Sequence, residues 1–453
     1  MDATRLSQIA QWAGGVLHGT DVEVRRVVTD SRSAGEGDLF VALRGARFDA
    51  HDFLGEVAGR GVAGVLVERG RAVDFRGPLV EVADTLSGLQ LLAARYRKAL
   101  PVRVVGITGS NGKTSTKDLT HAILSSRLKG WCTRGNLNNH IGVPLTLLSG
   151  GKADQFAVVE MGMNHAGEIA PLAAMAHPEV GIITNVGVAH IEHLGSREAI
   201  AREKGALAAA VGETGVVVLS AEDDFTPLIE SMTAARVVTA GICCGEVQAV
   251  DVYSHGEGSR FGLVCEGERV EVELGVPGMH MVRNAAMSAA AALALGLPLS
   301  SVAEGLRTLQ LSRGRLEIKV VGGTRFLDDS YNANPDSMKA ALATLSQWPI
   351  QGRRVAVLGR MGELGSFAEE GHRSVGAAAA LYSIDWLITL GEEARWISDE
   401  ARKGGVARVD HFEDLGKLAR ALRQEIASQE DLVLVKGSRS ASMERVIEEF
   451  SRL

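Results

Sequence analysis

Aromatic residues and cysteines are scarce in this sequence, and each shortage restricts the class of protein. Aromatic residues make up only 4% of the 453 residues although 46% are hydrophobic, which is typical of a soluble α/β protein with aliphatic cores. The four cysteines, Cys132, Cys243, Cys244 and Cys265, show no C-x-x-C spacing. We therefore expect no disulfide framework, and we expect the protein in a reducing compartment such as the cytoplasm.

Excess positive charge and long apolar runs are also missing. The formal net charge is -7, so bulk attraction to nucleic acid is not expected and phosphates must be bound by local groups. The most apolar stretch, residues 285–297, is shorter than a membrane span requires, and the N-terminus shows no signal peptide. We expect a cytoplasmic monomer with no nucleic-acid partner and no membrane insertion, long enough for two to four domains.

The sequence does contain a glycine-rich loop with the pattern of a phosphate cradle, at residues 106–116. A β-branched run predicts a buried strand before it, and helical spacing from Lys117 predicts a helix after it. Strand, glycine turn and helix N-terminus present N–H groups to an anion, while Lys113 adds a charge and Thr114 a metal-facing hydroxyl. The general P-loop pattern has glycine where this chain has Ile107, so the loop is a shorter variant. The alternative is an ordinary strand–helix connection.

Later segments of the sequence add side chains that are candidates for binding a metal ion. Residues 156–160 are a predicted buried strand ending in Glu160, the position of the magnesium-binding acid in other P-loop proteins. His190 follows the predicted strand 180–186 and is either a ligand beside carboxylate and phosphate oxygens or a loop histidine with a structural hydrogen bond. Lys204 on the next helix, taken alone, is a solvated charge, because an ammonium cannot ligate a cation.

Two further polar regions leave alternatives open. Segments 29–32 and 49–51 fit a phosphate or nucleobase site, and equally fit turns capped by Asp and Ser side chains. His280 and Asn284 open the alanine-rich helix, where they either face a base edge or cap the helix start.

Past residue 312, strands and helices alternate, which predicts a doubly wound, mostly parallel sheet. We therefore predict domains at 1–98, 99–312 and 313–453. Polar segments 328–335 and 436–440 follow strands of the last domain, where such sheets bind ligands; the alternatives are an Asn-Pro turn and a helix N-cap. No G-x-G-x-x-G follows its first strand, so a dinucleotide site is not supported.

These segments together resemble the Mur ligases, ATP-dependent amide-forming enzymes of peptidoglycan precursor synthesis. The cradle resembles that of the whole superfamily, folylpolyglutamate synthetases included. More selective are residues 133–144, 329–335 and 435–440, which resemble the family member that adds D-alanyl-D-alanine. The N-terminal segments 30–32 and 49–51 resemble the UDP-binding module of that member.

The resemblance implies a fold of three domains: a small α/β UDP-binding module, a central P-loop-type ATPase domain with a mostly parallel sheet, and a C-terminal Rossmann-like domain that binds the dipeptide and closes on ATP. It implies a ligase that joins D-alanyl-D-alanine to UDP-N-acetylmuramoyl-tripeptide through an acyl phosphate. The implied cofactors are ATP and two Mg²⁺ ions.

The resemblance also assigns roles to residues. It implies catalytic roles for Lys113, Glu160, His190, Lys204 and Arg315. It implies ATP binding by Thr108, Gly109, Ser110, Asn111, Gly112, Lys113, Thr114, Ser115, Asn284, Arg315 and Asp329. It implies metal binding by Thr114, Glu160, His190 and Lys204, the last as a CO₂-derived carbamate that turns the cation into an anionic oxygen ligand. It implies substrate binding by Ser31, Arg32, Asn136, Asn138, Asn139, His140, Tyr331, Asn332 and Asn334.

Some features depart from the resemblance or stay open. Ala50, Ala206 and Arg360 stand where the family commonly has glycine, glutamate and aspartate. Other readings are another ligase of the superfamily, such as a folate polyglutamate ligase, or a P-loop switch or small-molecule kinase, which needs no amine substrate. A binding-only role would leave Glu160, His190 and Lys204 without a purpose. No general base stands out, and the third peptide residue can be diaminopimelate or lysine.

Overall fold

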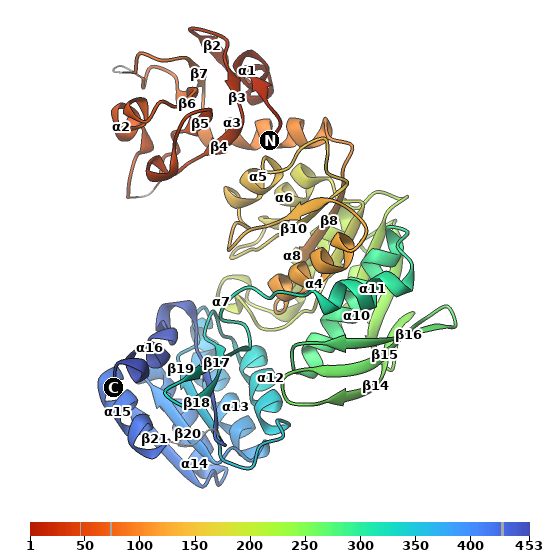
Figure 1. Ribbon diagram of the computed structural model, residues 1–453, viewed down its shortest axis with the longest axis vertical. Coiled ribbons are helices and arrows are strands. Elements are labelled where there is room, and N and C mark those ends of the chain that lie inside the picture. Colours follow the sequence, from red (N-terminus) through yellow and green to blue (C-terminus); the bar gives the residue numbers. More distant parts are fainter. Residues whose placement is uncertain (46, 73–74, 427–429) are drawn as a thin grey trace.

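The structure is a computed structural model that describes residues 1–45, 47–72, 75–426 and 430–453. Figure 1 shows three lobes that follow one another along the chain, from red at the N-terminus through yellow and green to blue at the C-terminus. Each lobe is built on a sheet whose strands are mostly parallel, which confirms the predicted α/β class. Within the described residues, no helix combines the length and apolarity needed to cross a membrane.

The first lobe has a sheet of order β2-β7-β6-β5-β4, parallel except for the pair β2 and β7. The inner strand β5 is buried throughout, which explains its continuous apolar run Leu39, Phe40 and Val41. The strands are β1 (Thr4–Arg5), β2 (Val16–His18), β3 (Glu23–Val24), β4 (Arg26–Val28), β5 (Asp38–Val41), β6 (Gly64–Glu68) and β7 (Leu79–Val82). The helices are α1 (Leu6–Ala13), α2 (Leu54–Gly59) and α3 (Thr85–Lys98), with short 3₁₀ turns η1 (Ser31–Ser33) and η2 (Ala50–Phe53).

The central lobe has a sheet of order β16-β15-β14-β13-β12-β11-β8-β10-β9. Its strands run parallel from β9 to β14, and the antiparallel pairs β14–β15 and β15–β16 extend its edge. The strands are β8 (Arg103–Thr108), β9 (Gly130–Cys132), β10 (Phe156–Glu160), β11 (Val180–Ile183), β12 (Val216–Ser220), β13 (Arg236–Ile242), β14 (Val247–Ser254), β15 (Ser259–Cys265) and β16 (Glu268–Leu274). The helices are α4 (Lys113–Ser125), α5 (Gly142–Leu147), α6 (Ile169–Ala176), α7 (Ile191–Leu194), α8 (Arg197–Ala210), α9 (Thr226–Glu230), α10 (Met279–Ala294) and α11 (Leu299–Arg307).

The C-terminal lobe has a sheet of order β17-β18-β22-β19-β20-β21, parallel except for the hairpin β17–β18. The strands are β17 (Glu317–Val321), β18 (Thr324–Asp329), β19 (Arg354–Gly359), β20 (Trp386–Leu390), β21 (Arg408–Phe412) and β22 (Leu432–Lys436). The helices are α12 (Pro335–Ser346), α13 (Ala368–Leu381), α14 (Arg395–Lys403), α15 (Leu415–Glu425) and α16 (Glu444–Arg452), with 3₁₀ turns η3 (Gly365–Phe367), η4 (Glu392–Ala394) and η5 (Arg439–Ala441).

Two predicted boundaries differ from the structure. Helix α4 begins at Lys113 and not at Lys117, because left-handed Gly112 (φ 79°) forms its N-cap and the polar first turn is already helical. Strand β11 ends at Ile183, since the backbone then turns toward the cradle, where the Thr184 hydroxyl donates to the Asn111 carbonyl. As a result, helix α4 starts directly at the cradle, and the loop after β11 begins directly beside it.

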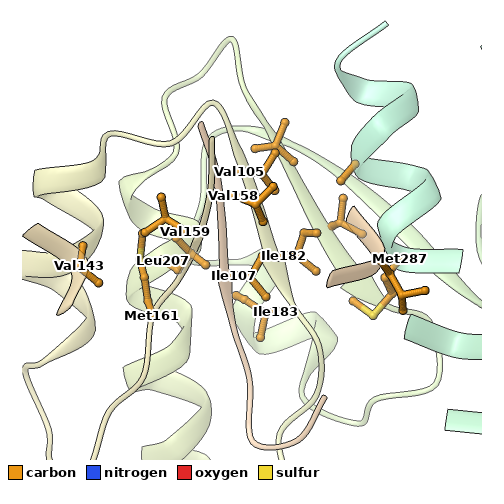
Figure 2. Close-up of a cluster of buried hydrophobic side chains, with 14 of the residues drawn as sticks. Val105, Ile107, Val143, Val158, Val159, Met161, Ile182, Ile183, Leu207 and Met287 are labelled. Atoms are coloured by element: carbon orange, nitrogen blue, oxygen red, sulfur yellow. The ribbon is translucent and has the colours of Figure 1, made fainter. Parts of the chain in front are cut away.

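The core under the cradle explains the departure from the general P-loop pattern. Figure 2 shows Ile107 of β8 among the side chains of β10, β11 and helices α8 and α10. Ile107 is completely buried, as are its neighbours Val158, Ile182 and Leu207. In this chain the position belongs to the sheet core, where burying an aliphatic side chain contributes roughly 1.5–3 kcal/mol.

Candidate active site

A cavity of about 1090 Å³ lies between the central and C-terminal lobes. From the central lobe it is lined by the cradle and by the segments that follow β10 and β11. From the C-terminal lobe it is lined by the segments that follow β18 and β22. These are the carboxyl ends of parallel strands, where open α/β sheets bind ligands. Two sheets therefore contribute ligand-binding edges to one cavity.

The cradle is packed too closely for any side chain at its glycines. Gly109 (φ 150°) and Gly112 (φ 79°) have positive φ angles, and a Cβ atom at Gly112 would lie 2.8 Å from Asn284 Nδ2. A Cβ atom at Gly109 would overlap the Thr184 hydroxyl. Helix α4 starts here, so the first N–H groups of the helix have no partner within it and point toward an anion.

Lys113 folds back over this loop. Its Nζ donates to the Gly109 carbonyl at 2.7 Å, and burial lowers the pKa of the ammonium from its ordinary value. The predicted ATP residues Ser110 to Ser115 and Asn284 all line the cavity, whereas Thr108 and Gly109 lie beneath it. The arrangement can bind the phosphates of a nucleotide.

Glu160 presents one free carboxylate oxygen to the cavity. Its Oε1 accepts a hydrogen bond from Asn138 Nδ2 at 2.8 Å, and its backbone N–H donates to Thr133 Oγ1 at 2.9 Å. Its Oε2 is buried and has no hydrogen-bond partner within the described part of the chain. A buried carboxylate oxygen without a partner is unfavourable unless a cation or donor reaches it.

His190 begins helix α7 in a left-handed backbone conformation (φ 63°). Its Nδ1 lies 2.5 Å from Glu363 Oε2, a carboxylate of the C-terminal lobe. Sequence reasoning missed Glu363, although the segment Gly359-Arg360-Met361 directly before it stood out. Arg360 itself pairs with Glu393 at 3.3 Å and does not line the cavity.

Lys204 is buried inside helix α8, with only 1% of its surface exposed. No hydrogen bond or ion pair of its ammonium is found among the described residues, and it does not line the cavity. Burial, followed by the nearby charge of Lys113, holds the pKa of Lys204 well below its ordinary value. The solvated helix charge suggested by the sequence alone is therefore wrong: Lys204 is a buried amine, and burial disfavours its charged form.

Residues of the C-terminal lobe reach across the cavity to the cradle. Arg315 Nη2 donates to Thr114 Oγ1 at 2.8 Å, and its guanidinium stacks over the Tyr331 ring at 4.5 Å. Asn334 Nδ2 donates to Asn111 Oδ1 at 2.7 Å. Asn334 Oδ1 caps α12 by accepting from the Ser337 N–H, so both polar ends of this side chain are engaged.

Asp329 and Asn332 form a second polar group on this side. Lys436 Nζ donates to Asp329 Oδ2 at 2.6 Å and to the Asn332 carbonyl at 2.9 Å. His280 faces the same pair from α10, and burial lowers the pKa of His280 to about 4, although Asp329 raises it. His280 is therefore a neutral imidazole at pH 7.

The substrate candidates lie in two separate places. Asn136, Asn138, Asn139 and His140 line the cavity, and Asn139 Oδ1 also accepts from the Gly142 N–H at the start of α5. Ser31 and Arg32 do not line the cavity and lie on η1 of the first lobe. The exposed Arg32 pairs with Asp30 at 2.7 Å, which holds the pKa of that carboxyl near 2.

The donor set fits a magnesium ion held largely by a nucleotide. Among the described residues, no group of three or more His, Cys, Asp or Glu side chains is arranged to hold a metal alone. Thr114 and the unpaired Oε2 of Glu160 both face the cavity. Mg²⁺ takes few protein ligands and completes its shell with water and phosphate oxygens.

Comparison with known proteins agrees with this geometry. Residues 107–292 match the family model of the Mur ligase middle domain, and residues 314–439 match that of the Mur ligase glutamate ligase domain. The UDP-N-acetylmuramoyl-tripeptide--D-alanyl-D-alanine ligase of Escherichia coli (strain K12) is 38% identical over 452 residues, covering 99% of this chain and 98% of that protein.

Solved structures show the same fold. A crystal structure of MurF from Acinetobacter baumannii superposes with a TM-score of 0.91 at 34% identity, covering 100% of both chains. A crystal structure of MurF ligase from Thermotoga maritima in complex with ADP has a TM-score of 0.84 at 29% identity, covering 95% of this chain and 97% of that one.

Proposed function

Because the chain belongs to the Mur ligase family, we propose that it joins D-alanyl-D-alanine to UDP-N-acetylmuramoyl-tripeptide with ATP, giving ADP, phosphate and the UDP-muramoyl-pentapeptide of peptidoglycan synthesis. The observation that carries the proposal is the shared cavity, which joins a phosphate cradle to the polar loops of a second sheet. Such a site suits a reaction that brings three substrates together. In this proposal the protein acts as a monomer in the cytoplasm, where ATP is available.

In this proposal each lobe binds one substrate. Residues 1–98 hold the UDP part through Ser31 and Arg32. Residues 99–312 hold ATP, and residues 313–453 hold the dipeptide and close on ATP.

The cradle amides and Lys113 hold the ATP phosphates, while Asn284 faces the adenine. Arg315 approaches the phosphates from the other lobe, and Asp329 lies near the ribose. Support comes from the hydrogen bond between Arg315 and Thr114, which brings a guanidinium to the start of helix α4.

Thr114, Glu160 and His190 are the residues that fit a magnesium ion, and a second ion fits the same cavity. The bound metal supplies positive charge that offsets the negative charge building on the transferring phosphoryl group. The unpaired Oε2 of Glu160 is the support for this assignment.

The acceptor peptide lies along Asn136, Asn138, Asn139 and His140. Its terminal carboxylate attacks the γ-phosphate of ATP, releasing ADP and forming an acyl phosphate. The amine of D-alanyl-D-alanine then attacks the acyl carbon and phosphate leaves with the bonding electron pair, while the ammonium proton goes to solvent. An α-amino group has a pKa of roughly 8, so a useful minority is already neutral at pH 7.

The dipeptide lies beside Tyr331 and Asn332 in this proposal. Asn334 acts from the same segment by holding the segment on the cradle through Asn111, since its side chain is engaged at both ends. The third residue of the peptide is left open between diaminopimelate and lysine.

Lys204 serves as a carbamate in this proposal. A neutral amine attacks CO₂, an N–C bond forms, one C=O electron pair moves to oxygen and a proton leaves the nitrogen. The low pKa of the buried Lys204 supports this, because only the neutral amine reacts. The carbamate offers anionic oxygens where an ammonium offers none.

The carbamate is tested by ¹³C NMR of the protein in ¹³C-bicarbonate. We expect a carbamate carbonyl resonance in the wild type that is missing in Lys204→Ala. The Lys204→Ala variant should lose most activity and regain part of it with added short carboxylates. Undiminished turnover by the wild type in bicarbonate-depleted buffer would refute the carbamate.

The function is tested by phosphate release from ATP with UDP-muramoyl-tripeptide, with and without D-alanyl-D-alanine, together with mass spectrometry of the product. We expect release that depends on the dipeptide and a product with one new amide. Turnover without the dipeptide and without a new amide would favour a kinase. Amide formation only with glutamate on a folate would favour another ligase of the superfamily.

A further inference from the structure

The loop between β11 and α8, residues 184–196, contacts the cradle on one side. The Gly187 N–H donates to Ser110 Oγ at 2.8 Å, and Asn185 Oδ1 accepts from the Asn111 N–H at 3.0 Å. The phosphate-binding loop and this loop are therefore joined by direct hydrogen bonds.

The same loop contacts the C-terminal lobe on its other side. The Val188 N–H donates to Asp336 Oδ2 at 3.1 Å, at the start of helix α12. Two residues further on, His190 Nδ1 lies 2.5 Å from Glu363 Oε2, and the Glu192 N–H points to the Glu363 carbonyl at 3.4 Å. Glu363 thus contacts the loop with both its side chain and its backbone.

Both residues of this contact have an unfavourable backbone conformation. His190 (φ 63°) and Glu363 (φ 60°) are both non-glycine residues in the left-handed region. A residue with a Cβ atom is disfavoured there, and it persists only where the surroundings enforce it. Two such residues facing each other across a lobe boundary point to a constrained functional contact.

The chemistry of the pair indicates its role. A histidine that binds a metal through one ring nitrogen usually has its other nitrogen held by a carboxylate, which fixes the ring orientation and the tautomer. Because Nδ1 of His190 faces the Glu363 carboxylate, the proton of the neutral ring belongs on Nδ1, and Nε2 keeps the lone pair that can bind a cation. The Nδ1 is buried and lies 2.5 Å from Glu363 Oε2, so the imidazole of one lobe and the carboxylate of the other are in direct contact.

We propose that Glu363 is a positioning residue: from the C-terminal lobe it orients His190 of the central lobe, so that the histidine is set for a cation only when the two lobes are together. This inference rests on the proposed function only for the presence of a nucleotide and a divalent cation. Metal binding at the cradle and closure of the lobes are then coupled, and each favours the other.

The test uses the full chain with Mn²⁺ and a non-hydrolysable imido analogue of ATP, and measures free Mn²⁺ by electron paramagnetic resonance. Glu363→Gln should weaken the affinity of the histidine-dependent Mn²⁺ site by roughly 10-fold, as loss of the outer partner of a metal-binding histidine typically does. Glu192→Gln removes the same charge two residues from His190 and should change nothing.

A second control separates orientation of His190 from lobe contact in general. Asp336→Asn weakens another carboxylate contact between the same loop and the same lobe, but not one through His190. It should reduce closure, measured as the radius of gyration by small-angle scattering, and so weaken Mn²⁺ affinity by a clearly smaller factor than Glu363→Gln does. An equal loss in Asp336→Asn would overturn the proposal.

The decisive measurement is a double-mutant cycle. If Glu363 acts through His190, Glu363→Gln should have no further effect on Mn²⁺ affinity in a His190→Ala background. An unchanged 10-fold effect in that background would contradict the proposal. Should Glu363→Gln unfold, Glu363→Asp, which keeps the charge on a shorter side chain, should give a partial loss.

These readouts are separate from those of the proposed function, since neither the UDP-linked substrate nor the dipeptide is present. If the protein does not form the amide but its Mn²⁺ affinity depends on Glu363, only the proposed ligase activity is refuted. A chain that forms the amide with Mn²⁺ affinity unaffected by Glu363→Gln refutes only the positioning role.

Discussion

At the scale of single residues, the site depends on two positions that tolerate no ordinary substitution. Gly112 combines a left-handed backbone with contact against Asn284, so it couples the cradle to helix α10. Lys204 is a buried amine with no hydrogen bond or ion pair in the described structure, and the charge of Glu203 offsets only part of the effect of burial on its pKa. One position is restricted by space and the other by charge.

Gly112→Ala should weaken binding of a non-hydrolysable ATP analogue at least 10-fold, measured by calorimetry. The added methyl meets Asn284, and the left-handed conformation costs about 1–2 kcal/mol for a residue with a Cβ. Gly405→Ala is the control, because Gly405 (φ 87°) carries the same strain with nothing within 4 Å. It should lose stability but keep nucleotide affinity. Equal affinity loss in both variants would contradict the role of the Asn284 contact.

Lys204→Met should lower turnover on the order of 100-fold yet raise the melting temperature. The pKa of Lys204 is lowered in the folded chain, so the unfolded chain binds its proton more readily and stability falls as pH drops below the ordinary lysine value. Methionine removes that penalty at similar volume. Lys98→Met, at an exposed helix position, should leave the melting temperature unchanged. A lower melting temperature for Lys204→Met would contradict a destabilising effect of the buried amine.

At the scale of elements, helix α12 is the part of the C-terminal lobe that docks on the cradle. Its N-terminus combines Asn334 as cap, Pro335 in the first turn and Asp336 against the loop after β11. The sequence predicts a helix over residues 336–348 and offers an Asn-Pro turn before it, whereas the helix runs over Pro335–Ser346 with Asn334 as its cap. It does not predict that the capping side chain also reaches Asn111, since that contact spans 223 positions of the chain.

Asn334→Ala and Asn334→Asp should separate capping from docking. Alanine removes the cap and should lower the free energy of unfolding by about 1 kcal/mol, whereas aspartate is as good a cap as asparagine. Neither keeps the donor to Asn111, so both should lower nucleotide affinity to a similar degree. Denaturant unfolding and calorimetry measure the two effects. If the alanine variant were as stable as the wild type, the Asn334 side chain would not stabilise helix α12 as its N-cap.

At the scale of the whole molecule, helix α3 joins the first lobe to the central one. It packs against α1 in its own lobe and against α5 and α6 in the next. Arg97 near its end is buried and donates to the Ala176 carbonyl at 3.0 Å, and Tyr96 Oη donates to the Gly150 carbonyl at 2.8 Å. The expected boundary at residue 98 therefore falls after an element that the central lobe also uses.

A chain beginning at residue 84 should fold better than one beginning at residue 99. The longer chain keeps α3 and its cap Asp84, whereas the shorter one exposes the apolar surfaces of α5 and α6. We expect the longer chain to bind the ATP analogue with nearly wild-type affinity and to melt several degrees higher. Equal melting temperatures would show that α3 belongs to the first lobe alone.

The sequence by itself determined the features that depend on neighbouring residues. Strand β10 was predicted with its observed bounds, and the cradle was located because glycine, lysine and threonine follow a β-branched run within a few positions. Strand β21 was missed because its short pattern gives no clear alternation, and helix α16 was missed although Val446, Ile447 and Phe450 are spaced as one helix face. The roles of the site residues came from family resemblance and not from these patterns.

Only the tertiary structure decided which distant groups meet. Arg315 reaches Thr114 over 201 positions, and Glu363 reaches His190 from a different lobe. Such contacts depend on how the central and C-terminal sheets are placed on either side of the cavity, which no local pattern encodes. The burial that lowers the pKa of Lys204 has the same origin, because desolvation is a property of the packed lobe and not of the helix that carries the residue.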